Sequence, residues 1–253
     1  MTSNSSVIDF LKNKNVFVFD TETTGLPEKT QKWGTYWDYK MNNKYDSSRI
    51  VSIAWVLIAS FDKNNIDKYT NTNININTNN NEIHHHLRYP EGFTEIPTTF
   101  IHGISLQDAL TKGIPFGIIL SNYGLAEALL AADYIVAHNV GFDYHVLMNE
   151  LFRIVNTNEP NIPIAILIKE KAQSCINHLE NLFNNGYVIC TGKLSTNVCK
   201  IAFPSANRYL GFKQTYKMPK LSELYKYFYG CEFENAHSAA GDVKALLECL
   251  IKL

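Results

Sequence analysis

The sequence predicts an α/β fold in which a mixed sheet of five strands is flanked by helices. Short, apolar, β-rich segments occur early in the chain, and segments with helical periodicity alternate with further strands later on. Hydrophobic residues make up 45% of the 253 residues, which is enough for a substantial core. No internal repeat is found. We expect a single domain over residues 1–253, with insertions near 28–48 and 70–82.

The first three strands are expected to form an antiparallel meander. Val16–Phe19 is a fully apolar run ending at Asp20 and predicts a buried strand. Arg49–Phe61 and Glu82–Tyr89 predict the second and third strands. Between them, Asn71–Asn81 has low complexity and is interpreted as a mobile hairpin tip.

Helices and strands alternate over the rest of the chain. Apolar periodicity predicts helices over Ile118–Ala132, Phe142–Val155 and Lys220–Tyr229. Pro163–Asn184 is expected to be mostly helical, and a last helix is expected over about Ser238–Leu250. Short apolar runs predict two more strands, Tyr134–Ala137 and Tyr187–Cys190.

Two segments are open to more than one reading. Lys32–Tyr45 interleaves aromatic residues with lysines, which suits either stacking on single-stranded nucleic acid or cover for an edge of the core. His84–His86 offers three potential metal ligands. Alternate residues of a strand face opposite sides, so a compact site is not expected there.

Composition limits the classes of function. The chain has 23 basic and 24 acidic residues, which argues against polyanion binding through bulk charge but not against a local site. Five scattered cysteines suggest neither zinc nor a disulfide framework, so a reducing intracellular compartment, cytoplasm or nucleus, is expected. The N-terminus lacks the pattern of a signal peptide, and no apolar run approaches membrane-spanning length.

The first chemical motif is F-D-T-E-T-T-G-L, beginning at Phe19. Asp20 and Glu22 are two apart at the end of a strand, so both side chains face the same way. Two such carboxylates repel each other, and a divalent cation such as Mg²⁺ relieves that repulsion. A turn with exposed acids is the alternative for this pair alone.

Two further motifs supply acids and a histidine. A-H-N-V-G-F-D ends at Asp143, where the N-terminal end of a helix favours an acid even without chemistry. A-H-S-A-A-G-D-V places His237 before the last helix and Asp242 in its first turns. Asp242 shares a face with Leu246 and Cys249, which should point it inward, where it needs a metal or a cation.

Together the three motifs resemble the DnaQ-like 3′–5′ exonucleases, in their DEDDh branch of the ribonuclease H-like superfamily. The resemblance extends from about Asn15 to Leu250. F-I-H-G-I-S (Phe100–Ser105) is similar to a segment that precedes the second motif in proofreading members, and K-L-S-E-L (Lys220–Leu224) to the helix before the third. The partner of the last Asp is His237 here, whereas the sister branch has Tyr.

This resemblance implies a ribonuclease H-like sheet and a two-metal mechanism with two Mg²⁺, which Mn²⁺ can replace. Asp20 would bridge both ions, Glu22 and Asp242 would complete the ligands of the first, and Asp143 would hold the second, partly through water. His237 would be the general base.

The resemblance also implies substrate-side residues. The backbone of Thr23 would meet the 3′-hydroxyl, and Leu26 would wedge against the last bases, with core packing as its alternative. His138 is placed beside the active strand, with a hydrogen-bonded core histidine as its alternative.

The predicted function is hydrolysis of nucleic acid, with DNA favoured, from a free 3′ end to nucleoside monophosphates. A polymerase or replication partner would act in trans, and no membrane is involved. The alternatives are an inactive nucleic-acid-binding or polymerase-docking module on the same fold, and an RNA-directed exoribonuclease.

Overall fold

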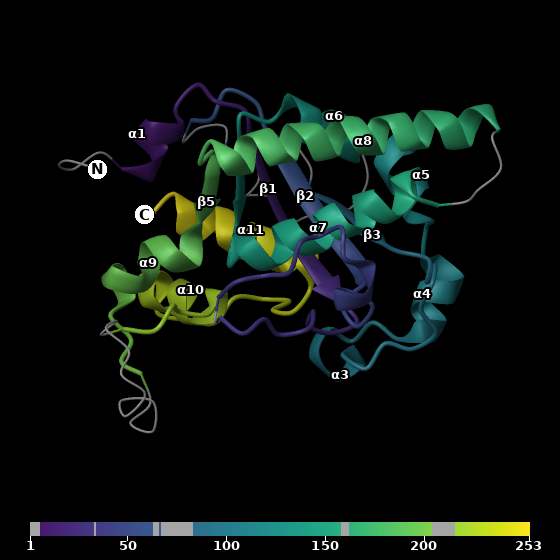
Figure 1. Cartoon of the computed structure of the whole chain (residues 1–253). Coiled ribbons are helices and arrows are strands. Elements are labelled where there is room, and N and C mark those ends of the chain that lie inside the picture. The colour runs from purple at the N-terminus through teal and green to yellow at the C-terminus, as the bar shows by residue number, and fades with distance from the viewer. Residues whose placement is uncertain (1–5, 33, 63–65, 67–82, 158–161, 204–215) are drawn as a thin grey trace.

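The computed structural model describes residues 6–32, 34–62, 66, 83–157, 162–203 and 216–253. Within these residues a five-stranded mixed sheet is flanked by helices, with the strand order β3-β2-β1-β4-β5 (Figure 1). The strands are β1 (Val16–Thr23), β2 (Ile50–Ile58), β3 (His84–Leu87), β4 (Tyr134–Ala137) and β5 (Val188–Cys190).

Strand pairing places β1 at the centre of the sheet. β1 is antiparallel to β2, and β2 is antiparallel to β3, so the expected meander is confirmed. β4 pairs in parallel with β1, and β5 pairs in parallel with β4. The expected hairpin tip Asn71–Asn81 and the insertion near 70–82 lie outside the described residues.

Most predicted helices are present, but one prediction is wrong. The segment Ile118–Ala132 forms two helices, α5 (Phe116–Asn122) and α6 (Leu125–Ala131), because the chain turns at Gly124, whose φ of 81° is left-handed. The other long helices are α7 (Val140–Val155), α8 (Pro163–Asn184), α10 (Leu221–Tyr229) and α11 (Ala239–Leu250).

Several short helices were not predicted. They are α1 (Val7–Leu11), the 3₁₀ helix η1 (Asn42–Lys44), α3 (Thr99–His102), α4 (Leu106–Lys112) and α9 (Thr191–Cys199). Among the residues that the structure describes, no helix combines the length and the apolar character needed to cross a membrane.

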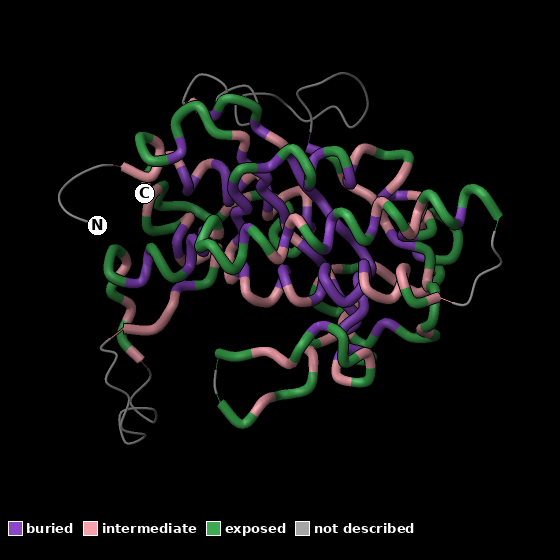
Figure 2. The backbone as a smooth tube through the Cα atoms, turned by 45° about the horizontal axis from the view of Figure 1, so that its top comes forward, coloured by how far each residue is buried: buried purple, intermediate pink, exposed green. Residues whose placement is uncertain are grey.

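Helices cover both faces of the sheet, and β1 alternates between two cores. Phe17 and Phe19 pack with residues of α5 to α8, whereas Val16 and Val18 pack with residues of α11. The strands and the inner helix faces form the buried centre of the molecule (Figure 2). Because side chains alternate along a strand, the later residues of β1 also point alternately toward these two cores.

The two ambiguous segments mainly pack against the protein. In Lys32–Tyr45, Tyr39 and Tyr45 are buried in the larger core, which supports the reading that this segment covers a core edge. In β3, His84 stacks on Trp55 with ring centroids 5.0 Å apart, while the ring of His85 is bonded to the Ser52 hydroxyl. These contacts place His84 and His85 on opposite faces of the sheet, as strand alternation predicts.

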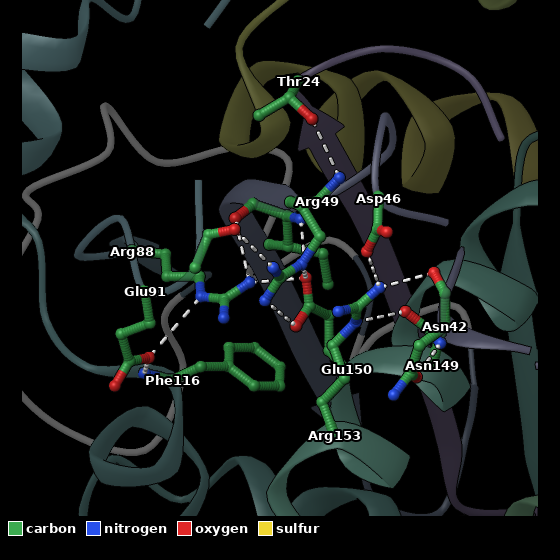
Figure 3. Close-up of polar contacts among 12 residues, drawn as sticks. Thr24, Asn42, Asp46, Arg49, Arg88, Glu91, Phe116, Asn149, Glu150 and Arg153 are labelled. Carbon is green, nitrogen blue, oxygen red and sulfur yellow. Dashed lines mark hydrogen bonds and ion pairs between the residues drawn. The ribbon is translucent and has the colours of Figure 1, made fainter. Parts of the chain in front are cut away.

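A buried ion-pair cluster joins β2, β3 and α7 (Figure 3). The Glu150 carboxylate accepts two hydrogen bonds from the Arg49 guanidinium and pairs with Arg88. Burial by itself would raise the pKa of Glu150, but the charges of Arg88 and Arg49 outweigh it and lower that pKa to about 2. The backbone of Arg49 exchanges hydrogen bonds with Thr24, so the cluster also supports the loop after β1.

Glu150→Ala is expected to lower the free energy of unfolding by about 3–5 kcal/mol, because it removes the ion-pair partner of the buried Arg49 guanidinium and leaves the buried Arg88 with Glu91 alone, 3.7 Å away. Chemical denaturation at pH 7 measures this change. Lys112→Ala, which breaks the exposed pair with Asp108, is the control and should change stability by less than about 1 kcal/mol. Equal effects of the two substitutions would show that the buried cluster contributes no special stability.

Candidate active site

Three of the predicted acids meet at the end of β1. Asp20, Glu22 and Asp242 each offer a carboxylate oxygen, and these oxygens all lie within 4.8 Å of one another. Asp20 and Glu22 follow Val16 and Val18 in the strand alternation and therefore face α11. Asp242 lies in the first turn of α11, and this places its carboxylate on the same side.

Asp143 reaches the site from the other face of the sheet. It lies in the first turn of α7 and is almost completely buried. The Thr21 hydroxyl and backbone N–H both donate to Asp143 Oδ1, at 2.8 and 3.2 Å. Thr21 faces the same side of the sheet as Phe17 and Phe19. The four predicted acids are therefore arranged as a group of three, with Asp143 next to it.

The pKa values of all four carboxylates are raised, and for three of them neighbouring carboxylates contribute. Burial is the main cause in every case. Neighbouring charges add to it, so that the pKa of Asp20 is well above its usual value and that of Glu22 rises to about 8. The pKa values of Asp143 and Asp242 rise to about 7, even though Asp143 accepts hydrogen bonds from Thr21 and Asp242 one from the backbone of His237.

Among the residues that the structure describes, no Lys or Arg forms an ion pair with this cluster of four acids. A set of hard oxygen donors with no protein cation fits a divalent ion of the Mg²⁺ type. The donor chemistry therefore fits the metal that the sequence predicts.

The unbalanced charge predicts a pH-dependent stability. An acid whose pKa is raised by folding stabilises the fold below its unfolded pKa of about 4 and loses that contribution as pH rises through the folded value. Without divalent ions, the free energy of unfolding should therefore fall as pH rises from about 4 through about 8, the folded value of Glu22. Mg²⁺ or Mn²⁺ should raise the melting temperature more at pH 8 than at pH 5.

Scanning calorimetry with and without the ion measures this effect. Glu22→Gln serves as the comparison, since it removes one of the repelling charges and should flatten the profile. A metal-induced shift that is as large at pH 5 as at pH 8 would contradict the electrostatic argument.

His237 lies directly before the N-cap of α11. Its backbone has a left-handed φ of 66°, and its side chain is exposed. Its backbone N–H bonds to Asp242, which ties the position of the histidine to a carboxylate of the trio. The predicted general base is thus at the edge of the acidic cluster and open to solvent.

The predicted substrate-side residues differ in their surroundings. Leu26 is 71% exposed, which excludes the alternative that Leu26 packs in the core. Thr23 is buried, and its carbonyl accepts from the Thr98 hydroxyl. His138 bonds through Nδ1 to the Thr191 hydroxyl and through Nε2 to the Pro219 carbonyl, so both ring nitrogens have protein partners. That pattern favours the alternative of a hydrogen-bonded core histidine.

Sequence reasoning missed two neighbours of the site. Phe100, on α3, is 86% exposed and follows Thr98, which contacts the end of β1. The Tyr36 side chain bonds to Asn139, just before α7, and its ring stacks on His145 with centroids 4.8 Å apart. The motif F-I-H-G-I-S drew attention to the segment of Phe100 but did not indicate its contacts. For Tyr36, the only indication in the sequence was the aromatic content of Lys32–Tyr45.

Comparison with known proteins gives no identification. No family model matches the chain, and no curated protein shows significant similarity to it.

Proposed function

We propose that this protein is a magnesium-dependent 3′–5′ exonuclease with a ribonuclease H-like sheet, of the DnaQ-like DEDDh type. The observation that carries the proposal is the trio Asp20, Glu22 and Asp242, whose oxygens lie within 4.8 Å of one another and face no basic partner in the described structure. The pKa values of these acids are raised first by burial and, for Asp20 and Glu22, also by the neighbouring carboxylates, which supports a site that holds cations.

The residues divide into ligands and a proton acceptor. Asp20, Glu22 and Asp242 would hold one Mg²⁺, and Asp143 would contribute to a second near Asp20. Bound Mg²⁺ would supply activation of water and charge neutralisation at the phosphoryl oxygens. The exposed imidazole of His237 has the solvent access needed to accept a proton from the attacking water near neutral pH.

Side chains around the acids suit the end of a nucleic acid strand. Leu26 and Phe100 are exposed apolar residues, the first three positions after β1 and the second two positions after Thr98, whose hydroxyl donates to Thr23. Apolar and aromatic surface accepts any base by stacking, which suits removal of nucleotides without regard to sequence. DNA is the favoured substrate.

An end-labelling assay tests the function. We expect nucleoside monophosphates to be released stepwise from the 3′ end of a DNA oligonucleotide in Mg²⁺, with no release in EDTA. A 5′-labelled strand should shorten gradually, whereas a 3′-labelled strand should release its label in the first step. Tight binding without cleavage would support the inactive module instead, and faster degradation of the matching RNA would favour the exoribonuclease.

A further inference from the structure

His102 and Thr98 form a hydrogen-bonded chain that ends on the loop following Glu22. The Thr98 hydroxyl donates to the Thr23 carbonyl at 2.5 Å, and it lies 2.9 Å from Nε2 of His102. The backbone N–H of Ile104 lies 3.1 Å from Nδ1 of His102. Three successive contacts therefore connect the end of α3 to the residue after a predicted metal ligand.

The direction of this chain is fixed by its chemistry. A backbone N–H only donates, so Nδ1 of His102 accepts and the neutral ring carries its proton on Nε2. The Thr98 hydroxyl uses its single proton on the Thr23 carbonyl, so it must accept from Nε2. The two constraints agree, and they define one neutral tautomer. Burial lowers the pKa of His102, and this favours the neutral ring.

Local backbone geometry is arranged for these contacts. Thr98 is the N-cap of α3, where a threonine usually bonds to the backbone of its own helix, yet its side chain makes no cap bond. Gly103 ends the helix with a left-handed φ of 74°, and this turn returns the chain so that Ile104 meets the imidazole.

The loop needs this support because the strand ladder is irregular there. Glu22 is paired with Ser52, but Thr23 is paired with Ile50, so the register shifts between the two residues. On the other side, the Thr24 N–H donates to the Arg49 carbonyl. The loop is thus held at one side by Arg49 and at the other by Thr98.

We propose that His102 and Thr98 are positioning residues of the nuclease site, which act together by fixing the Thr23 backbone beside the carboxylates. Neither residue is expected to touch the reacting atoms. This inference rests on the proposed exonuclease function. It assigns to the α3 segment the role of holding the Thr23 backbone in place beside the metal ligands.

Thr98→Val removes the hydroxyl with little change of shape, and Thr98→Ser keeps it. We expect Thr98→Val to lower kcat/KM on single-stranded DNA about 10- to 10²-fold, since small displacements near reacting groups have effects of that size. Thr98→Ser should restore most of the activity. Mn²⁺ affinity, measured by calorimetry without nucleic acid, should stay unchanged in both variants because the carboxylates are not altered.

A double-mutant cycle tests whether the two residues act as one unit. The His102 ring also bonds directly to the Thr23 backbone, so both residues hold the same carbonyl. The double variant His102→Ala/Thr98→Val should therefore lose less activity than the product of the two single losses. Losses that multiply in the double variant would overturn the proposal. So would equal activities of Thr98→Val and the wild type.

A measurement that does not depend on catalysis distinguishes failure of this inference from failure of the proposed function. Amide hydrogen exchange of Thr24 and Gly25 should be faster in Thr98→Val than in Thr98→Ser, with similar melting temperatures. If the wild type degrades no nucleic acid, the exonuclease proposal fails, while the exchange comparison still reports on the loop. If the wild type is active but loop exchange is the same in both variants, the positioning role is wrong.

Discussion

Asp20→Asn is expected to abolish magnesium-dependent degradation, with a loss of roughly 10³-fold or more, because a neutral amide cannot replace the carboxylate at the centre of the acidic cluster. Asp20 is the acid on which Asp143, Asp242 and Glu22 all act. Its replacement therefore affects both proposed ion sites at once. Initial rates on 3′-labelled DNA measure the loss.

Stability measurements distinguish this loss from unfolding. In the absence of metal, Asp20→Asn removes a charge from a group of like charges, so its melting temperature at pH 8 should equal or exceed that of the wild type. The increase in melting temperature caused by Mn²⁺ should disappear. Asp38→Asn, an exposed acid in the loop before β2, is the matched control and should keep both activity and metal response. Retention of activity by Asp20→Asn would refute the metal assignment.

Substitution of His237 is expected to lower turnover by roughly 10²–10⁴-fold, as for loss of a general base. The backbone at this position restricts the choice of variant. Alanine is strained at a φ of 66°, whereas asparagine tolerates left-handed geometry. His237→Asn therefore removes the imidazole while keeping the backbone N–H that bonds to Asp242.

The rate as a function of pH gives the sharper test of His237. Loss of a general base removes an ascending limb from the dependence of kcat on pH, so we expect the profiles of the wild type and His237→Asn to differ in that limb. Mn²⁺ affinity should change little. His178→Asn, on α8, replaces a histidine that bonds to the Ala132 carbonyl and should leave the rate unchanged. A wild-type pH profile in His237→Asn would exclude His237 as the base.

The regular elements near the site could be predicted from sequence because their patterns are local. Val16–Phe19 predicted the central strand, and the segment Pro163–Asn184, which was expected to be mostly helical, forms α8. β1 continues to Thr23 because its polar residues are alternately directed to two faces, one toward α11 and one toward Asp143. A search for apolar runs ends such a strand too early.

Other features depend on geometry that sequence does not reveal. The break at Gly124 is a single left-handed residue inside a helical pattern. The separation of Asp143 from the other acids follows from the packing of α7 and α11 on opposite faces of the sheet. The contact between Thr98 and Thr23 joins residues 75 positions apart, and neither residue type indicates it.

The measurement that tests the central claim most directly is anomalous diffraction from crystals grown with Mn²⁺ and a nucleoside 5′-monophosphate. We expect one manganese ion bound by Asp20, Glu22 and Asp242, and a second between Asp20 and Asp143, with the nucleotide phosphate in contact with both. Crystals that bind the nucleotide with no manganese among these carboxylates, or bind manganese only elsewhere, would contradict the account.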